Sequence, residues 1–228
     1  YIRDAASGDF WSTAHQPTAT RPMHYEAIFT EARAEFRRRD HDFEAHTEIV
    51  VSPEDDIELR RLRITNRART RRTIDVTSYA EVVLASAAAD ALHPAFSNLF
   101  VQTEIIPQRQ AILCTRRPRS HDEPAPWMFH LMAIHGPQSL DVSFETDRMA
   151  FIGRGRTVAA PQAMLDAGRL AGNQGSVLDP IVAIRHRITL EPQQTATIDM
   201  AFGMAETRAA ALSLVGKYQD RHLADRVF

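Results

Sequence analysis

Lysine is nearly missing from this chain of 228 residues. Lys217 is its only lysine, although lysine and arginine together number 27. Almost every positive charge is therefore a planar guanidinium, whose fork of donors suits carboxylates and hydroxyl groups. The formal net charge is −2, so no overall field draws the chain to nucleic acid. Most of the arginine clusters have acidic neighbours in sequence, the cluster at 116–119 being the exception, which predicts cross-strand ion pairs rather than a nucleic-acid surface.

Cysteine and long apolar runs are also scarce. Cys114 is the sole cysteine, which excludes an intrachain disulfide, and it lies in a predicted strand, where we expect a core residue. No apolar run approaches the roughly 18 residues of a membrane span, and no signal peptide is visible. The chain begins at Tyr1 inside a motif and ends at Phe228 inside a helical pattern. We therefore expect a piece of a larger protein, itself without a membrane span.

Cofactor and metal signatures are weak as well. The glycines of Phe151–Arg156 and Gly172–Ser176 match neither a dinucleotide fingerprint nor a phosphate loop, so no cofactor is predicted. Asp40, Asp42, Glu44 and His46 alternate along one strand, but alternate side chains of a flat strand lie about 7 Å apart. We interpret them as a solvated face and predict no metal site.

What the chain does contain is strand after strand. Apolar residues alternate with polar ones over 43–51, 57–65 and 73–84, and further strands are predicted at 99–106, 110–116, 127–134, 141–147, 181–190 and 195–203. A short polar connection between 57–65 and 73–84 predicts a hairpin, and adjacent polar residues at Arg60 and Arg61 predict a bulge. Proline and glycine punctuate the connections and no long helix separates the strands, which indicates an all-β antiparallel sandwich.

The pattern changes at residue 206. Apolar residues then recur at three-to-four spacing, which predicts a helix over 206–228 with Thr207 as its N-cap. Its apolar face is wide enough to need a partner. We divide the chain into a β-sandwich domain at 1–205 and a linker helix at 206–228.

Two groups of residues are candidates for binding sugar. Arg3, Asp4 and Trp11 open the chain, and an indole that stacks on a sugar ring beside planar hydrogen-bonding groups is a recurrent arrangement. The alternative is an edge strand, a turn and a buried tryptophan. The second group joins the loop residues His93, Asn98 and Gln102, which suit hydroxyl recognition, to a basic cluster of Arg116, Arg117 and Arg119.

These segments resemble one family. Tyr1–Asp4 with Gly8, Trp11–Ser12 and Pro17 is similar to the start of the β-sandwich in inverting glycoside phosphorylases such as cellobiose and chitobiose phosphorylase (the glycosyltransferase family 36-like group). Later segments are a closer match to cyclic β-1,2-glucan synthases: 51–61, 77–82, 93–100, 115–120, 145–148 and 175–180. Residues 25–33 lack the Arg-His-Gly and Gly-Tyr-Thr stretch of the phosphorylases. The resemblance therefore favours the middle, transglycosylating module of the synthase.

The resemblance implies a super-sandwich related to galactose mutarotase, with the catalytic carboxylates in an absent (α/α)6 barrel after residue 228. The parent would be a bacterial inner-membrane enzyme that makes or cyclises β-1,2-glucan, with this domain on the cytoplasmic side. We expect an accessory domain that binds glucan, packs on the barrel and has no turnover alone. Two alternatives remain open: a self-contained epimerase, which needs a carboxylate base and a histidine acid on one face, and a scaffold that never touches glucan.

Overall fold

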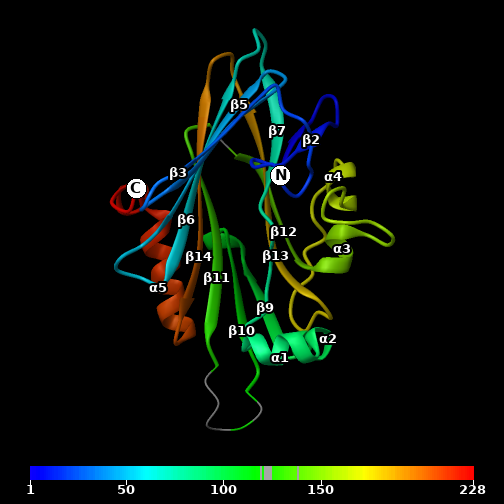
Figure 1. Cartoon of the computed structure of the whole chain (residues 1–228), viewed down its shortest axis with the longest axis vertical. Helices are drawn as coiled ribbons and strands as arrows, with labels where there is room; N and C mark the ends of the chain where they lie inside the picture. The colour runs from blue at the N-terminus through cyan, green and yellow to red at the C-terminus, as the bar shows by residue number, and fades with distance from the viewer. Residues whose placement is uncertain (119, 121–124, 138) are drawn as a thin grey trace.

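The computed structural model describes residues 1–118, 120, 125–137 and 139–228, and two antiparallel sheets dominate it (Figure 1). The predicted all-β sandwich is confirmed. The small sheet has the order β12-β13-β7-β1-β2, with β8 beside β13, and the large sheet has the order β3-β4-β5-β6-β14-β11-β10-β9. The strands of the small sheet are β1 (Ile2–Asp4), β2 (Phe10–Trp11), β7 (Arg72–Thr77), β8 (Ala80–Glu81), β12 (Ser139–Asp147) and β13 (Pro180–Leu190). Those of the large sheet are β3 (His24–Phe29), β4 (Ala34–Asp40), β5 (Phe43–Val51), β6 (Ile57–Asn66), β9 (Val101–Ile106), β10 (Ala111–Arg116), β11 (Trp127–His135) and β14 (Thr195–Ala205).

Short helices cover three parts of the sandwich. They are α1 (Ala87–Leu92), α2 (Pro94–Asn98), the 3-10 turn η1 (Pro107–Arg109), α3 (Arg148–Ile152), α4 (Gln162–Leu165), α5 (Arg208–Gln219) and α6 (Arg221–Asp225). Helices α3 and α4 pack on the outer face of the small sheet, where Phe151 and Met164 contact Ile181. Helix α2 replaces the loop predicted at 93–98, because Pro94 occupies its first position, where a missing N–H costs nothing.

The main core lies between the two sheets. Apolar residues of β5, β6 and β14 face those of β7 and β13, and the packed side chains include Leu62, Ile64, Ile74, Ile184 and Ile198. Cys114 belongs to the same cluster and is fully buried, as the sequence predicts, and burial raises the pKa of its thiol.

A second core lies on the outer face of the large sheet, under α5. Ala211, Val215 and Tyr218 of α5 pack on Leu59 and Phe129. The N-cap prediction is confirmed, since the Thr207 hydroxyl accepts a hydrogen bond from the N–H of Ala210 at 3.1 Å. The helix that the sequence treats as a linker therefore has the sandwich itself as its partner (Figure 1).

Two predictions about strand β6 are wrong, namely the bulge and the hairpin. Its register with β5 and β14 is continuous, so there is no bulge at Arg60 and Arg61. The apolar phase changes because Leu59 faces the α5 core whereas Leu62 faces the inter-sheet core. The predicted hairpin is also wrong: β6 belongs to the large sheet and β7 to the small one, so residues 67–71 cross between the layers.

Candidate functional site

The opening residues lie inside the protein. Trp11 is 1% exposed, and its ring packs against Phe43 with 5.9 Å between centroids. The Arg3 Nε donates to the carbonyl of Met164 at 3.0 Å, and Asp4 accepts from Arg72. This placement corrects the expectation of sugar stacking on Trp11, because neither face of the indole is open to a ligand. It matches the alternative of a buried tryptophan beside a turn.

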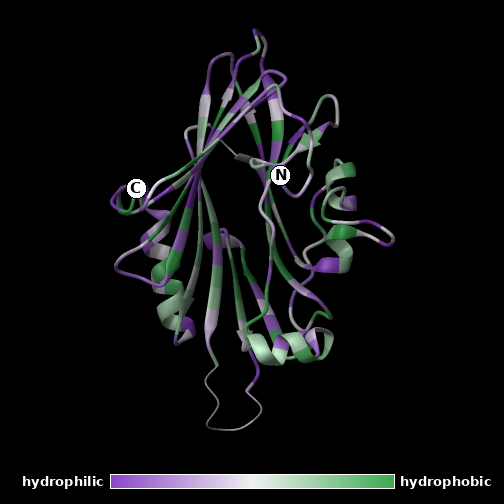
Figure 2. Cartoon of the chain, viewed as in Figure 1, coloured by the Kyte–Doolittle hydropathy of each residue, from purple (hydrophilic) through white to green (hydrophobic). Residues whose placement is uncertain are grey.

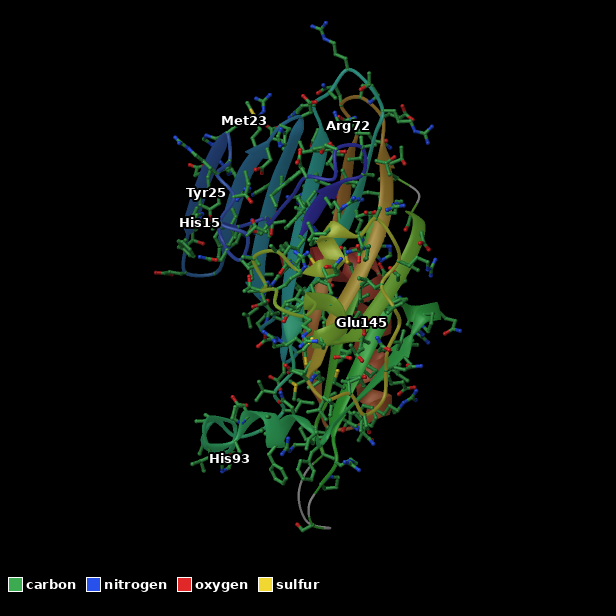
Figure 3. The ribbon with its side chains drawn as sticks, turned by 90° about the vertical axis from the view of Figure 1, so that its right-hand side faces the viewer. His15, Met23, Tyr25, Arg72, His93 and Glu145 are labelled. Atoms are coloured by element: carbon green, nitrogen blue, oxygen red, sulfur yellow. The ribbon has the colours of Figure 1, made fainter. Side chains whose placement is uncertain are left out.

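The second group gathers at the other end of the long axis, around α2. His93 lies between α1 and α2, on a segment that projects from the body (Figure 3). The Arg116 Nη1 donates to the carbonyl of Ser97 at 2.8 Å, and the Arg117 Nη2 donates to that of Leu99 at 3.3 Å. Both arginines therefore hold the carboxyl end of α2, which their position in sequence does not reveal.

Two members of that group do not join it. Gln102 shares a face of β9 with Glu104, whose carboxylate pairs with Arg208, the first residue of α5, so Gln102 lies on the α5 side of the large sheet. Arg119 lies outside the described residues.

Asn98 leads to a network that the sequence did not mark. Its Nδ2 donates to Asp179 Oδ1 at 3.0 Å. Arg148 Nε donates to Glu81 Oε1 at 3.0 Å and its Nη1 lies 3.7 Å from Asp179 Oδ2. The Tyr79 hydroxyl donates to Glu81 Oε1 at 3.0 Å. We call Tyr79, Glu81, Asn98, Arg148 and Asp179 the Arg148 network.

The Arg148 network joins four of the glucan-synthase-like segments, namely 77–82, 93–100, 145–148 and 175–180. Segments that are far apart in the sequence thus converge on one half-exposed polar surface. Burial raises the pKa of the Asp179 carboxyl and the neighbouring carboxylate of Glu81 adds to the rise, while Arg148 opposes it. Apart from Asn98, which its residue type also marked, the sequence resemblance was the only signal that pointed to these residues.

Exposed apolar residues directly follow or precede members of the network in the sequence, as Leu99, Met149 and Leu178 do. Phe96 on α2 is 54% exposed and Leu178 is 77% exposed. Figure 2 shows hydrophobic colour over much of α1 and α2. We call this area the α1–α2 surface, defined by Val83, Leu92, Phe96, Leu99, Met149 and Leu178.

Buried carboxylates are held as fixed charges. Asp75 accepts from Arg187 at 2.7 and 2.9 Å, and Asp199 accepts from Arg61 at 2.7 and 2.8 Å. Burial opposes the charge of Asp199, but Arg61 and His135 lower the pKa of its carboxyl. A general acid needs a raised pKa, so Asp199 does not suit that role, and the ion pairs of both carboxylates with arginine serve the structure. They also confirm the predicted arginine–carboxylate pairing.

Three of the described histidines do not suit the role of the acid that an epimerase needs. Burial lowers the pKa of His130 to about 3 and that of His186 to about 4, so both rings are neutral near pH 7. His46 is less buried, but its Nε2 lies 3.0 Å from Glu35 Oε2. A direct pair of this kind leaves no space for a substrate between acid and base, so the geometry does not favour a self-contained epimerase.

Glu35, His46 and Glu48 bring three possible metal-ligand atoms within 4.8 Å of one another. Arginines already occupy this group, since Arg33 lies 2.5 Å from Glu48 and Arg63 pairs with the same carboxylate. Guanidinium groups repel a divalent cation and compete for its ligands. Of the alternating residues of 40–46, only His46 takes part, and the donor set fits ion pairs better than a metal.

Comparisons with known proteins agree with the fold. The family described as "Glycosyl hydrolase 94, supersandwich domain" matches residues 1–221, and the chain belongs to this family. It is 37% identical to the cyclic beta-(1,2)-glucan synthase NdvB of Rhizobium meliloti (strain 1021) over 81% of this chain and 6% of that protein.

More distant relatives include two phosphorylases. The chain is 22% identical to solabiose phosphorylase of Paenibacillus borealis over 95% of its length, and 25% identical to N,N'-diacetylchitobiose phosphorylase of Vibrio furnissii over all of it. It spans 27% of each of these proteins. Within the part of the chain that the structure describes, no helix is long and apolar enough to cross a membrane.

Proposed function

We propose that this supersandwich is a non-catalytic accessory domain of a larger enzyme that makes or cyclises β-1,2-glucan. It would pack on a helical catalytic barrel of the same parent and shape the glucan cleft. The observation that carries this proposal is the convergence of four glucan-synthase-like segments on the Arg148 network. Several large apolar side chains are exposed near these segments, among them Phe96 and Leu178, and exposed apolar surface of this kind often marks a protein interface.

The identity of 37% to a cyclic glucan synthase supports β-1,2-glucan as the substrate class of the parent, and the resemblance of the sequence segments favours its middle, transglycosylating module. We extend the proposal to a parent in the bacterial inner membrane with this domain on the cytoplasmic side, an expectation that comes from the resemblance alone. Arg3, Asp4 and Trp11 would brace the sandwich. His93, Asn98, Arg116 and Arg117 would set the position of α2 at the cleft, with Gln102 and Arg119 as further candidates for glucan contact.

The first test uses the chain alone. Residues 1–228 are incubated with β-1,2-gluco-oligosaccharides, with and without inorganic phosphate, and the products are separated by anion-exchange chromatography. We expect no elongation, cyclisation or phosphorolysis, because the buried carboxylates of Asp75 and Asp199 are fixed in ion pairs with arginine. Turnover by the purified chain would overturn the accessory role.

The second test places a charge in the α1–α2 surface of the full-length parent. Leu178→Asp is compatible with folding of the isolated domain, because Leu178 is 77% exposed, but it would bury a charge at the proposed interface. We expect at least a tenfold loss of glucan synthesis. Leu165→Asp, on the 44% exposed Leu165 of α4, is the matched control. Equal activity of the two variants would contradict docking through this surface.

A further inference from the structure

The inner face of the large sheet is open at one end. Between the two sheets this face forms the main core, but its apolar side chains continue beyond the small sheet into solvent. Phe29 is 73% exposed and Val51 is 71% exposed, whereas Phe36 and Ile49 are half-buried. The strand register places these residues on one face with Thr47, because Phe36 is opposite Thr47 and Ala34 is opposite Ile49.

A cleft of about 180 Å³ lies where this open face meets the small sheet. Tyr1 and Tyr79 line it from the small-sheet side, and Phe36, Arg60 and Phe202 line it from the large sheet. Pockets for drug-sized ligands measure roughly 300–1,000 Å³. The smaller volume suits a single ring.

The lining is chemically suited to a sugar. The ring of Phe36 supplies apolar surface for the C–H face of a pyranose, whereas the rings of Tyr1 and Tyr79 pack on Phe151 and that of Phe202 is stacked on His130 at 4.1 Å. The guanidinium of Arg60 lies 5.3 Å from the centroid of Phe202, and its Nε donates to Glu58 at 2.5 Å. Because this ion pair balances the local charge, the cleft favours a neutral ligand over an ionic one.

One polar group in the lining has no partner among the described residues. Thr47 lines the cleft, it is 4% exposed, and its Oγ1 is buried without a hydrogen bond. Buried hydroxyls are normally paired, and leaving one unpaired costs free energy. A ligand hydroxyl is the kind of group that would satisfy it.

We propose that this cleft binds one terminal pyranose ring of a neutral glucan, with the chain continuing over Phe36 toward Phe29. The proposal rests on the proposed function for the identity of the sugar, but it assigns a different surface from the α1–α2 surface. Thr47 and Phe36 would then be sugar-binding residues that neither the resemblance nor the composition indicated.

The test measures binding of sophorose, the β-1,2-linked glucose disaccharide, by saturation-transfer NMR and calorimetry. We expect saturable binding by the 228-residue chain in the millimolar range. Thr47→Val keeps the shape and removes the hydroxyl, so affinity should fall about fivefold to tenfold, the worth of one buried hydrogen bond. Its melting temperature should not fall, because the hydroxyl has no partner to lose. Phe36→Ala should weaken binding by at least as much.

Thr65→Val is the matched control, since the Thr65 hydroxyl bonds that of Thr195 at 2.8 Å on the opposite face of the sheet. The proposal is overturned if the unmodified chain shows no saturable binding, or if Thr47→Val or Phe36→Ala binds as tightly as Thr65→Val. Sedimentation of the same samples detects a dimer formed through the open face, and a dimer that sophorose does not dissociate would also overturn it. The two proposals can fail separately. If the chain does not bind sophorose but Leu178→Asp still lowers glucan synthesis by the parent, the sugar-binding cleft is wrong and the accessory role stands.

Discussion

The buried pair of Arg61 and Asp199 gives the most direct test of the electrostatics. Their side chains are 4% and 2% exposed, and two hydrogen bonds of 2.7 and 2.8 Å join them. Arg61 also pairs with Asp225 of α6 at 2.6 Å and lies over the ring of Phe228. The pair thus fastens the end of the chain to β6 and β14. Asp199→Asn removes the charge and nearly preserves the shape.

The expected loss in the free energy of unfolding follows from the charge of Arg61, which remains buried after Asp199→Asn. Breaking a buried pair costs about 3–5 kcal/mol because the surviving charge is left uncompensated. Asp225 still offers partial compensation, so we expect the lower end, about 3 kcal/mol. For a domain of this size each kcal/mol moves the melting temperature by about 2–4 °C, which gives a fall of about 6–12 °C.

The assay is thermal unfolding followed by circular dichroism, with urea unfolding for the free energy. Arg208→Ala is the control, because Arg208 and Glu104 form an exposed pair that should be worth less than about 1 kcal/mol. The double variant Arg61→Met with Asp199→Leu should recover most of the loss, since no buried charge remains. Equal effects of Asp199→Asn and Arg208→Ala would refute the reasoning, as would a double variant no more stable than Asp199→Asn.

Three further predictions concern stability. Gly203→Ala should cost about 1–3 kcal/mol in urea unfolding, because a Cβ there would lie 2.5 Å from both Ile57 and Phe129, whereas Gly168→Ala, with open space around it, should cost little. Stability should fall as the pH drops from about 6.5 toward 4, by about 1.4 kcal/mol per pH unit for each of His130 and His186. Their folded pKa values, lowered to about 3 and about 4, mean that the unfolded state takes up protons first; a flat profile over this range would contradict the burial of neutral rings. Thr207→Ala should cost about 1 kcal/mol by thermal unfolding through the lost N-cap of α5, and an unchanged melting temperature would show that α5 needs no cap.

The sequence predicted most strands and the β-sandwich fold class well, because the alternation of apolar and polar residues depends directly on which side chains are buried. It did not predict β4, whose residues Arg37–Arg39 interrupt the strand pattern before residue 43 with three adjacent charges. In the structure Arg38 is 1% exposed and pairs with Asp40 at 2.6 Å. A charge that is neutralised by its neighbour two positions along can occupy a core-facing position, and alternation by itself does not reveal this.

The candidate site was less predictable for a physical reason. Trp11 attracted attention because of its residue type, but the type does not say which face is covered. The Arg148 network consists of ordinary polar residues that gain meaning from being brought together by β8, α2, α3 and the start of β13. Such convergence depends on tertiary contacts, so the spacing of residues within a single segment does not encode it.

The two faces of strand β6 affect how the domain unfolds. Leu59 supports the core under α5 and Leu62 supports the core between the sheets, so one continuous strand couples the two. Disturbance of either core shifts the backbone of the other, and the domain should therefore lose both in a single cooperative transition. Leu59→Ala and Leu62→Ala should accordingly be non-additive although they face opposite sides. A cut after residue 205 would not trim a dispensable tail but would leave one of the two cores without its cover.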